Sequence, residues 1–297
     1  MDLRIWFAET RPSFLLLTPL AYSVGAAGAY IEGSFDAFRA LLGLAGVMFA
    51  HLSVNVINDY FDYKSGLDLK VRRTPFSGGS GILPAGLLEA RDVYLFAVGC
   101  LILGGAIGFY FALITGWMLL PLIALAALTI YFYTTHLSRW FLGEVFTGLH
   151  FGPLMALGGH FIQTGRYGAH ALASGIVPGI LVGTLLFLNE FPDVEADREV
   201  GRRNAVIQLG LARASRVYVA LIASTYVWVI ACVLSGLMPP TALVTFVTLP
   251  LALKASRGVL RDHGDVGKLI PSMGANVILV LSMTGMTALG LLLSALF

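Results

Sequence analysis

Asparagine and aspartate residues gather where a long apolar segment ends, in the stretch NVINDYFD that starts at residue 55. Asn55 and Asp59 are four residues apart, as are Asn58 and Asp62, so each pair would share one face of a helix. Asp68 follows beyond a Ser-Gly pair, which we expect to end that helix. Carboxylate and amide oxygens are the ligands that Mg²⁺ prefers. The first chemistry that these residues indicate is therefore the binding of a divalent cation.

A second cluster of the same kind follows another apolar segment, in the stretch NEFPDVEAD that starts at residue 189. Its members Asn189, Asp193 and Asp197 are spaced by four, which predicts one shared helix face. Carboxylates four residues apart repel each other, and near hydrocarbon the repulsion is screened less while desolvation adds to the cost. A divalent cation would remove both penalties, so we expect the two clusters to hold two Mg²⁺ ions with a diphosphate between them.

Basic residues flank both clusters and could neutralise the remaining phosphate charge. They are Lys64, Lys70, Arg72, Arg73, Arg198, Arg202 and Arg203. A competing interpretation is that charges at helix ends face headgroups and water, with the basic residues anchoring to anionic lipid. Two clusters at helical spacing favour the metal site over that interpretation.

The elements that position these clusters span a membrane. The 297 residues are 57% hydrophobic and 12% charged, whereas soluble domains average about 25% charged residues. Apolar runs long enough to cross a bilayer recur along the chain. We predict an all-α polytopic protein, a single transmembrane domain over 1–297 with a bundle of nine transmembrane helices. The spans are roughly 12–31, 38–62, 92–114, 117–135, 141–163, 168–190, 213–235, 238–256 and 272–296.

These spans divide the lysine and arginine residues unequally between the two sides. Of the 19 in the chain, only Arg39 and Arg166 fall on one side. Because cytoplasmic loops carry the excess of positive charge, we expect a cytoplasmic N-terminus and an outer C-terminus. The loops at about 63–91 and about 191–212, which carry the acidic clusters, would then place the site on the cytoplasmic side of the cell membrane.

The two stretches NDYFDYKSGLD and NEFPDVEAD resemble the paired Asp-rich motifs of the UbiA superfamily of intramembrane prenyltransferases. The resemblance extends from RPSFLLLTP at residue 11 to the last helix. Where many members have the last Asp of the first motif, this chain has Gly66, and Asp68 follows. That feature, RTPFSGGSGIL at residue 73 and NEFPDVEADREVGRRN are similar to the branch that prenylates 1,4-dihydroxy-2-naphthoate for menaquinone.

The resemblance implies Mg²⁺-dependent transfer of a polyprenyl group from a polyprenyl diphosphate to an aromatic acceptor, through an allylic carbocation in a membrane-embedded cavity. It implies the metal ligands Asn58, Asp59, Asp62, Asp68, Asn189, Asp193 and Asp197. The implied catalytic residues are Asp62, Asp193 and Asp197, with Tyr133 and Arg139 where some members carry a Tyr and a Lys. The implied contacts to the diphosphate are Lys64, Lys70, Arg72, Arg73, Arg198 and Arg202. We expect a lipid bilayer around the protein and no nucleic acid partner, and the oligomeric state stays open.

Two alternatives stay open at the level of sequence. The same fold could use another acceptor: 4-hydroxybenzoate, haem or a glycerol-phosphate lipid. A cation or phosphate transporter would also carry intramembrane acids, but transporters place them near the middle of the bilayer. We expect His51, His150 and His160 to form hydrogen bonds between helices, and Glu144 to act as a base or to be paired structurally.

Overall fold

The computed structural model describes residues 2–70, 73–139 and 142–296, and in these ranges the chain is helical, without strands. The predicted all-α class is confirmed. The helices are α1 Leu3–Glu9, α2 Pro12–Leu15, α3 Leu17–Ile31, α4 Ala37–Ser65, η1 Leu67–Leu69, α5 Ala90–Thr115, η2 Trp117–Leu119, α6 Leu120–Phe132, η3 Leu137–Arg139, α7 Gly143–Leu149, η4 His150–Leu154, α8 Met155–Thr164, α9 Ala169–Asn189, α10 Val194–Glu199, α11 Ala205–Leu209, α12 Leu211–Leu234, η5 Pro240–Thr248, α13 Leu249–Asp262, α14 Val266–Leu293 and η6 Ser294–Leu296.

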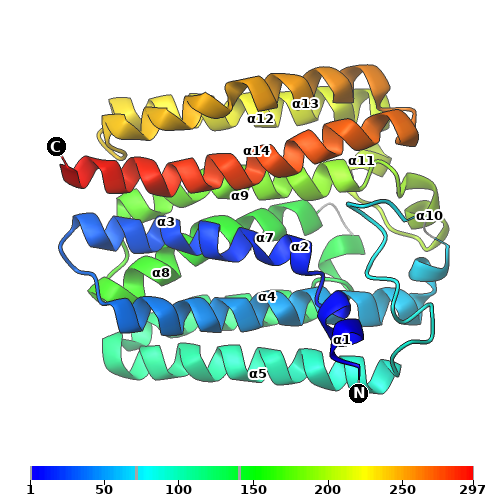
Figure 1. Cartoon of the computed structure of the whole chain (residues 1–297), viewed down its shortest axis with the longest axis horizontal. Coiled ribbons are helices and arrows are strands. Elements are labelled where there is room, and N and C mark those ends of the chain that lie inside the picture. The colour runs from blue at the N-terminus through cyan, green and yellow to red at the C-terminus, as the bar shows by residue number, and fades with distance from the viewer. Residues whose placement is uncertain (1, 71–72, 140–141, 297) are drawn as a thin grey trace.

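The long helices lie side by side along one direction, and the N- and C-termini lie at opposite ends of the bundle (Figure 1). The short helices α1, α10 and α11 gather at the end where α4 and α9 finish, on the right of Figure 1. We call this the motif end. The other end, where residues 32–36 join α3 to α4, we call the turn end. The two predicted clusters, at the C-terminal ends of α4 and α9, therefore meet at the motif end.

Eight segments of the described chain are long and apolar enough to cross a membrane, and a shorter apolar one runs over Trp117–Phe132. A multi-pass membrane protein is thereby confirmed. The count of nine crossings and the sidedness stay predictions. The two largest boundary differences are of equal size: α13 ends at Asp262 instead of about 256, and the last helix begins at Val266 instead of about 272. The last helix begins early because Asp265 caps it by accepting a hydrogen bond from the Lys268 backbone N–H.

Glycines let several helices approach closely. A Cβ added to Gly152 in η4 would lie 2.4 Å from Gly179 Cα in α9, well inside contact distance, so only glycine fits there. In the glycine-rich part of α5, a Cβ on Gly104 would meet the Gly46 carbonyl oxygen of α4 at 2.9 Å, whereas one on Gly105 would meet nothing within 4 Å. Gly104 therefore permits the close approach of α5 to α4, and Gly105 has no such role.

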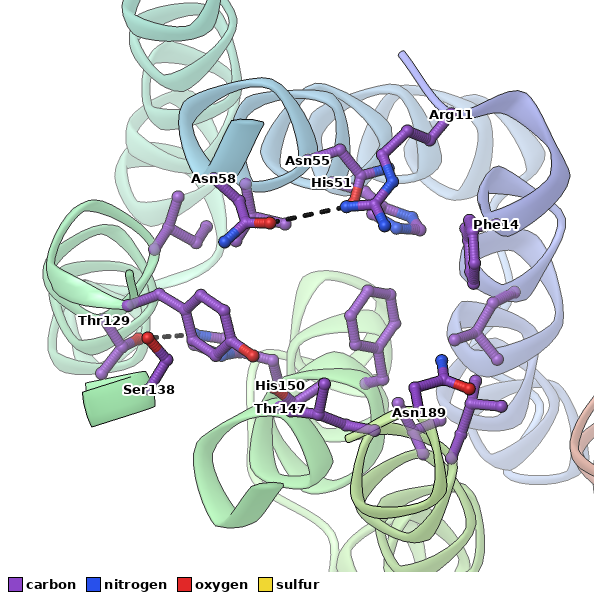
Figure 2. A pocket seen from close by; sticks show the side chains of 18 of the residues that line it. Arg11, Phe14, His51, Asn55, Asn58, Thr129, Ser138, Thr147, His150 and Asn189 are labelled. Carbon is purple, nitrogen blue, oxygen red and sulfur yellow. Dashed lines mark hydrogen bonds between the residues drawn. The ribbon is translucent and has the colours of Figure 1, made fainter. Parts of the chain in front are cut away.

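The helix that follows the predicted Tyr–Arg segment is irregular. α7 passes into the π-helical turn η4, which contains Pro153, before α8 continues in the same direction. A proline removes one backbone donor and widens the local turn. This turn aims His150 at the cavity described below (Figure 2). Cys100 and Cys232 are buried free thiols.

Candidate active site

The first cluster lies on the last turns of α4. Asn58 Nδ2 donates to Asp62 Oδ2 at 3.1 Å and to Thr134 Oγ1 at 3.0 Å. Asn58 Oδ1 accepts from Arg11 Nη1 at 3.5 Å (Figure 2). The helix ends as predicted, at Gly66 in the left-handed conformation with φ 78°. The predicted i, i+4 relation between Asn58 and Asp62 is therefore present as a direct hydrogen bond.

The second cluster does not lie on one continuous helix face, so that prediction is wrong. α9 ends at Asn189 and α10 begins after Asp193, its N-terminal flanking residue, with a turn between them. Pro192 sits in this turn and cannot donate a helical hydrogen bond. Asn189 and Asp193 nevertheless both line the same cavity, as does Asp197 of α10. The turn between α9 and α10, and not a continuous helix face, brings these three side chains to the same cavity.

Arg202 connects the two clusters. Its Nη2 contacts Asp62 Oδ1 on α4, and its Nη1 donates to Asp197 Oδ1 at 3.2 Å. Asn204 Nδ2 donates to the other oxygen of Asp197 at 2.9 Å. Carboxylates from two segments far apart in the sequence thus share one guanidinium group. The structure places both clusters around a single centre of charge.

Asp59 lies behind this centre and does not line the cavity. It is 1% exposed, and its Oδ2 accepts from the Ser80 backbone N–H at 2.8 Å. Arg11 Nη1 lies 3.5 Å from its Oδ1. The Ser80 hydroxyl donates to Glu9 Oε2 at 2.7 Å. Asp59 therefore fastens the segment after η1 and the N-terminal helix to α4.

Asp68, in η1, is buried among the same groups, and its Oδ2 has no hydrogen-bond partner. A Cβ on Gly79 would lie 3.1 Å from that oxygen, and Gly79 has φ +70°, so a glycine is required where the chain covers Asp68. Two residues earlier, Ser77 Oγ donates to Asp193 Oδ1 at 3.4 Å. The segment at 76–80 thus contacts both acidic clusters, Asp68 through Gly79 and Asp193 through Ser77.

The centre of charge opens into a cavity of about 290 Å³. At the motif end it is lined by polar side chains: Arg11, Asn55, Asn58, Asp62, Asp68, Ser77, Asn189, Glu190, Asp193, Asp197 and Arg202. Figure 2 shows Asn58 and Asn189 reaching into it from opposite walls. Towards the turn end the lining becomes apolar, with Leu17, Val47, Ala50, Val54, Leu122, Ala126, Leu154, Met155 and Val182. Val47 precedes Asp62 by four helical turns on α4, so the apolar part extends about 22 Å from the acidic part.

Of the predicted phosphate contacts, Arg202 alone among the described ones lines the cavity. Lys64, Lys70, Arg73 and Arg198 are exposed and lie outside the lining, and Lys70 pairs with Glu199 at 3.1 Å. Arg72 lies outside the described residues. Arg11, which directly precedes α2, lines the cavity although it was not among the predicted phosphate contacts.

Tyr133, predicted from the resemblance, lines the cavity at the C-terminal end of α6. Arg139 ends η3, and its side chain lies outside the described part of the structure. Among the other aromatic residues near the helix ends, the hydroxyl of Tyr131 on α6 hydrogen-bonds to that of Tyr94 on α5 at 3.0 Å. Both belong to a separate hydrophobic cluster between α4 and α5 and do not line the cavity. The aromatic faces that do line it are Phe14, Phe76 and Phe151.

The predicted interhelical hydrogen bonds of histidine are present. His51 Nδ1 lies 2.6 Å from Thr18 Oγ1 of α3, and His150 Nε2 lies 2.6 Å from Thr129 Oγ1 of α6 (Figure 2). Glu144 Oε1 accepts from the Ala205 backbone N–H at 3.1 Å, which is a structural pairing with the start of α11.

Burial and mutual repulsion raise the pKa values of the carboxyl groups beyond the ends of the spans. The pKa of Asp68 rises to about 8, through burial and then the charges of Asp62 and Asp59. Burial, followed by the charge of Asp197, raises the pKa of Asp193 to about 7. The pKa of Glu190 is raised well above its ordinary value by burial. At neutral pH this cluster retains protons unless a cation replaces them.

The donor set fits Mg²⁺. The buried Asp68 Oδ2, Asn189 Oδ1 and Glu190 Oε2 have no hydrogen-bond partner, and all three line the cavity at its acidic end. They are hard oxygen donors, of the kind that bind magnesium together with phosphate oxygens. A cation at this place would satisfy the unpartnered atoms and relieve the repulsion.

Sequence reasoning missed four residues of the site: Arg11, Ser77, Gly79 and Glu190. Arg11 also fits the excess of positive charge that sets topology, and its position directly before Pro12 at the start of the first span is the one signal that sets it apart. The Ser-Gly-Gly-Ser run at residue 77 has no charge that would indicate a site. Glu190 is marked only by its position between the predicted ligands Asn189 and Asp193.

The family model described as the UbiA prenyltransferase family matches residues 18–276. A relative from Bacillus subtilis, 1,4-dihydroxy-2-naphthoate octaprenyltransferase, is 28% identical over 275 residues, which cover 90% of this chain and 86% of the relative. The protein of the same name from Escherichia coli is 28% identical over 278 residues, covering 88% and 86%.

Among solved structures, the chain is similar to a UbiA homolog from Archaeoglobus fulgidus bound to GPP and Mg²⁺. The TM-score is 0.64 at 17% identity, with 96% of this chain and 99% of the other covered. At that identity the likeness shows a shared fold.

Proposed function

The chain belongs to the UbiA prenyltransferase family, and from that premise we propose that it transfers a polyprenyl group from a polyprenyl diphosphate to 1,4-dihydroxy-2-naphthoate. The acceptor is inferred from the relatives of Bacillus subtilis and Escherichia coli, whose names state it. The observation that carries the proposal is the position of Arg202. It joins Asp62 and Asp197 at the mouth of a cavity that is acidic at one end and apolar at the other.

This division of the cavity matches the two parts of a polyprenyl diphosphate. The charged head would lie among the acidic residues at the motif end, and the isoprenoid tail would lie between α3, α4, α6 and α9. An apolar tail gains roughly 0.8 kcal/mol for each buried CH₂ group, so the apolar part of the cavity contributes binding and orientation.

We propose Mg²⁺ as the cofactor, held by Asp62, Asp68, Asn189, Asp193 and Asp197, with Asn58 and Asp59 supporting them. The bound GPP and Mg²⁺ of the Archaeoglobus fulgidus homolog support this choice, as do the unpartnered oxygens of Asp68 and Asn189. When bound, Mg²⁺ would stabilise the negative charge that develops on the leaving diphosphate.

The side chains of the protein have separate tasks in this reaction. Arg202 and Arg11 donate hydrogen bonds to diphosphate oxygens, since both guanidinium groups line the acidic end of the cavity. The allylic C–O bond breaks, the electron pair leaves with pyrophosphate, and a ring carbon of the acceptor bonds to the allylic carbon and loses its proton.

The carbocation must be kept from water during this step. The lining towards the turn end is mainly apolar, and its polar side chains His51, Thr129, Thr147 and His150 are all engaged in hydrogen bonds, so free nucleophiles are few. Phe14 and Phe151 present aromatic faces that stabilise a cation electrostatically. We place Tyr133, which lines the same cavity from the C-terminal end of α6, next to the reacting carbon.

We further propose that residues 1–297 form one transmembrane domain with nine crossings and that the motif end faces the cytoplasm. The unequal distribution of Lys and Arg supports this sidedness.

The test is prenyl transfer by the purified protein in liposomes, with a labelled polyprenyl diphosphate and Mg²⁺. 1,4-Dihydroxy-2-naphthoate, 4-hydroxybenzoate, haem and a glycerol-phosphate lipid are offered in parallel. We expect product with 1,4-dihydroxy-2-naphthoate and its loss on metal chelation. Preference for another acceptor would overturn the acceptor alone, and no product with any acceptor would overturn the proposed function.

A further inference from the structure

A second group of potential metal ligands lies at the turn end, far from the acidic clusters. Glu32 follows α3, His160 belongs to α8, and His170 lies in the first turn of α9. One ligand atom from each lies within 4.8 Å of the others. Two of the three residues are imidazoles, which Mg²⁺ does not favour and zinc does.

The hydrogen bonds of His160 direct its second ring nitrogen at Glu32. Its Nδ1 lies 3.1 Å from the Arg166 carbonyl oxygen, which can only accept, so the neutral ring carries its proton on Nδ1. The Thr164 hydroxyl, 3.2 Å from the same nitrogen, has two carbonyl oxygens within 3.0 Å to receive its own proton. Nε2 of the fully buried His160 lies 2.9 Å from Glu32 Oε1. This contact is attractive when the ring carries a second proton, or when a metal ion takes the place of that proton between the two atoms.

His170 repeats this relation on the other side of Glu32. Its Nε2 contacts the same Oε1, yet this buried nitrogen makes no hydrogen bond. The two rings are in edge-to-face contact, with centroids 5.3 Å apart. A Cβ on Gly168 would lie 3.0 Å from His160 Nε2 and 3.2 Å from His170 Nε2. Glycine at this position therefore leaves open the space that both nitrogens face.

We propose that Glu32, His160 and His170 bind a divalent transition-metal ion of the zinc type at the turn end. Two imidazole nitrogens and one carboxylate oxygen with a fourth position open is a donor set that zinc takes in proteins. Ligand atoms around tetrahedral zinc are about 3.3 Å apart, so small side-chain rotations suffice. The Arg166 carbonyl orients His160 as the outer partner of a metal-bound histidine does.

The second oxygen of Glu32 is held separately. Arg166 Nη2 donates to Oε2 at 2.7 Å, which orients the carboxylate and leaves Oε1 for the metal. The ion would join the ends of α3, α8 and α9 at the turn end. Residues elsewhere on the same three helices, such as Leu17, Met155 and Val182, line the substrate cavity. Zinc binding would therefore stiffen the apolar end of the substrate cavity from outside it.

The test uses purified, chelator-stripped protein in detergent and measures zinc binding by equilibrium dialysis with excess Mg²⁺ present, which blocks the oxygen-only cluster. We expect one zinc per chain, a higher midpoint of thermal unfolding with zinc, and at least tenfold weaker binding in Glu32→Gln and His170→Gln. His136→Gln is the matched control, since His136 is an exposed histidine bonded to its neighbour Thr135, and it should bind as the unmodified protein does.

X-ray absorption at the zinc edge provides a second measurement that does not depend on the variants folding. The signal of two imidazole ligands and an oxygen is expected for the unmodified protein. Equal zinc uptake by His170→Gln and the unmodified protein, a spectrum without imidazole, or no uptake at all would overturn the proposal. The last of these outcomes would show a metal-free hydrogen-bonded cluster.

Discussion

Asp193 is an acidic residue of the cavity that can be replaced with little expected effect on folding. It follows the end of α9, lines the cavity and accepts one hydrogen bond, from Ser77 at 3.4 Å. We expect Asp193→Asn to lower turnover by about 10²-fold or more, because a neutral amide binds Mg²⁺ more weakly than a charged carboxylate does and each 1.4 kcal/mol costs tenfold. Steady-state prenyl transfer measures the effect.

Glu195 offers the matched control, because it lies two residues further on, exposed, in the first turn of α10. Glu195→Gln removes the same charge near the same helix and should keep turnover within about twofold. Equal activity of Asp193→Asn and Glu195→Gln would take Asp193 out of the ligand set.

The pH dependence of stability follows from the raised pKa values of Asp193 and Asp68. Their ordinary value is 3.8, and burial raises the pKa to about 7 and about 8. The folded, metal-free protein therefore binds protons more tightly than the unfolded chain, so the free energy of unfolding falls as pH rises from about 4 to about 8. Mg²⁺ competes with these protons, and its stabilising effect should grow across about pH 7–8.

Thermal unfolding in detergent at about pH 6 and about pH 8, with and without Mg²⁺, measures both slopes. We expect the metal-free midpoint to be higher at the lower pH and the shift caused by Mg²⁺ to be larger at the higher pH. A Mg²⁺ effect of equal size at both pH values would contradict the assignment of these carboxyl groups to the metal.

The individual residues of the site were predictable where charge and spacing agreed. Asp62, Asp193 and Asp197 follow from two acidic clusters that each end an apolar run. Arg11 and Glu190 did not follow, because a single charged residue at a helix end is equally well explained by topology or by the water interface. Their roles depend on which helix packs opposite, and no local pattern contains that information.

At the scale of the elements, the contact of η4 with α9 is one of the close backbone approaches that the site depends on. We expect Gly152→Ala to lower stability by roughly 1–3 kcal/mol, because its Cβ would overlap Gly179 Cα and neither backbone can move freely. Gly105→Ala is the control, with open space for its Cβ and better helix propensity. Thermal unfolding of the two variants should differ in sign relative to the unmodified protein, and similar losses in both would contradict this packing account.

The long helices were predictable from apolar length, since a run of about 20 apolar residues has few other stable forms in a bilayer. Pro153, Pro178 and Pro192 predict possible kinks, and Pro192 predicts that the chain turns Asp193 inward, but the sequence does not give the form of each break. The spacing of Asn189, Asp193 and Asp197 fits a straight helix, whereas in the fold a turn that contains Pro192 replaces it. Pro153 lies in a π-helical turn and Pro178 lies inside the regular helix α9, because a proline can kink, widen or simply sit inside a helix.

For the whole molecule, the bundle separates two chemistries along its length. Oxygen donors and the two cavity arginines lie at the motif end, and the histidine cluster with Glu32 lies at the turn end. The two cations that the spans assign to the sparse side, Arg39 and Arg166, both lie at the turn end. Arg39 donates to the Ile162 carbonyl oxygen at 3.4 Å, and Arg166 pairs with Glu32. The distribution of charge predicted from the sequence thus coincides with the two ends of the fold.

Sidedness in the membrane is the prediction that this distribution makes for the whole molecule. Phe35→Cys at the turn end and Glu195→Cys at the motif end place single thiols on exposed positions, while Cys100 and Cys232 are buried and should react slowly. With a membrane-impermeant maleimide on intact cells, we expect labelling of the first variant and labelling of the second only after permeabilisation. The physical reason is that Lys and Arg are retained on the cytoplasmic side during insertion. The reverse pattern would put the diphosphate site outside the cell, where a cytoplasmic polyprenyl diphosphate could not reach it.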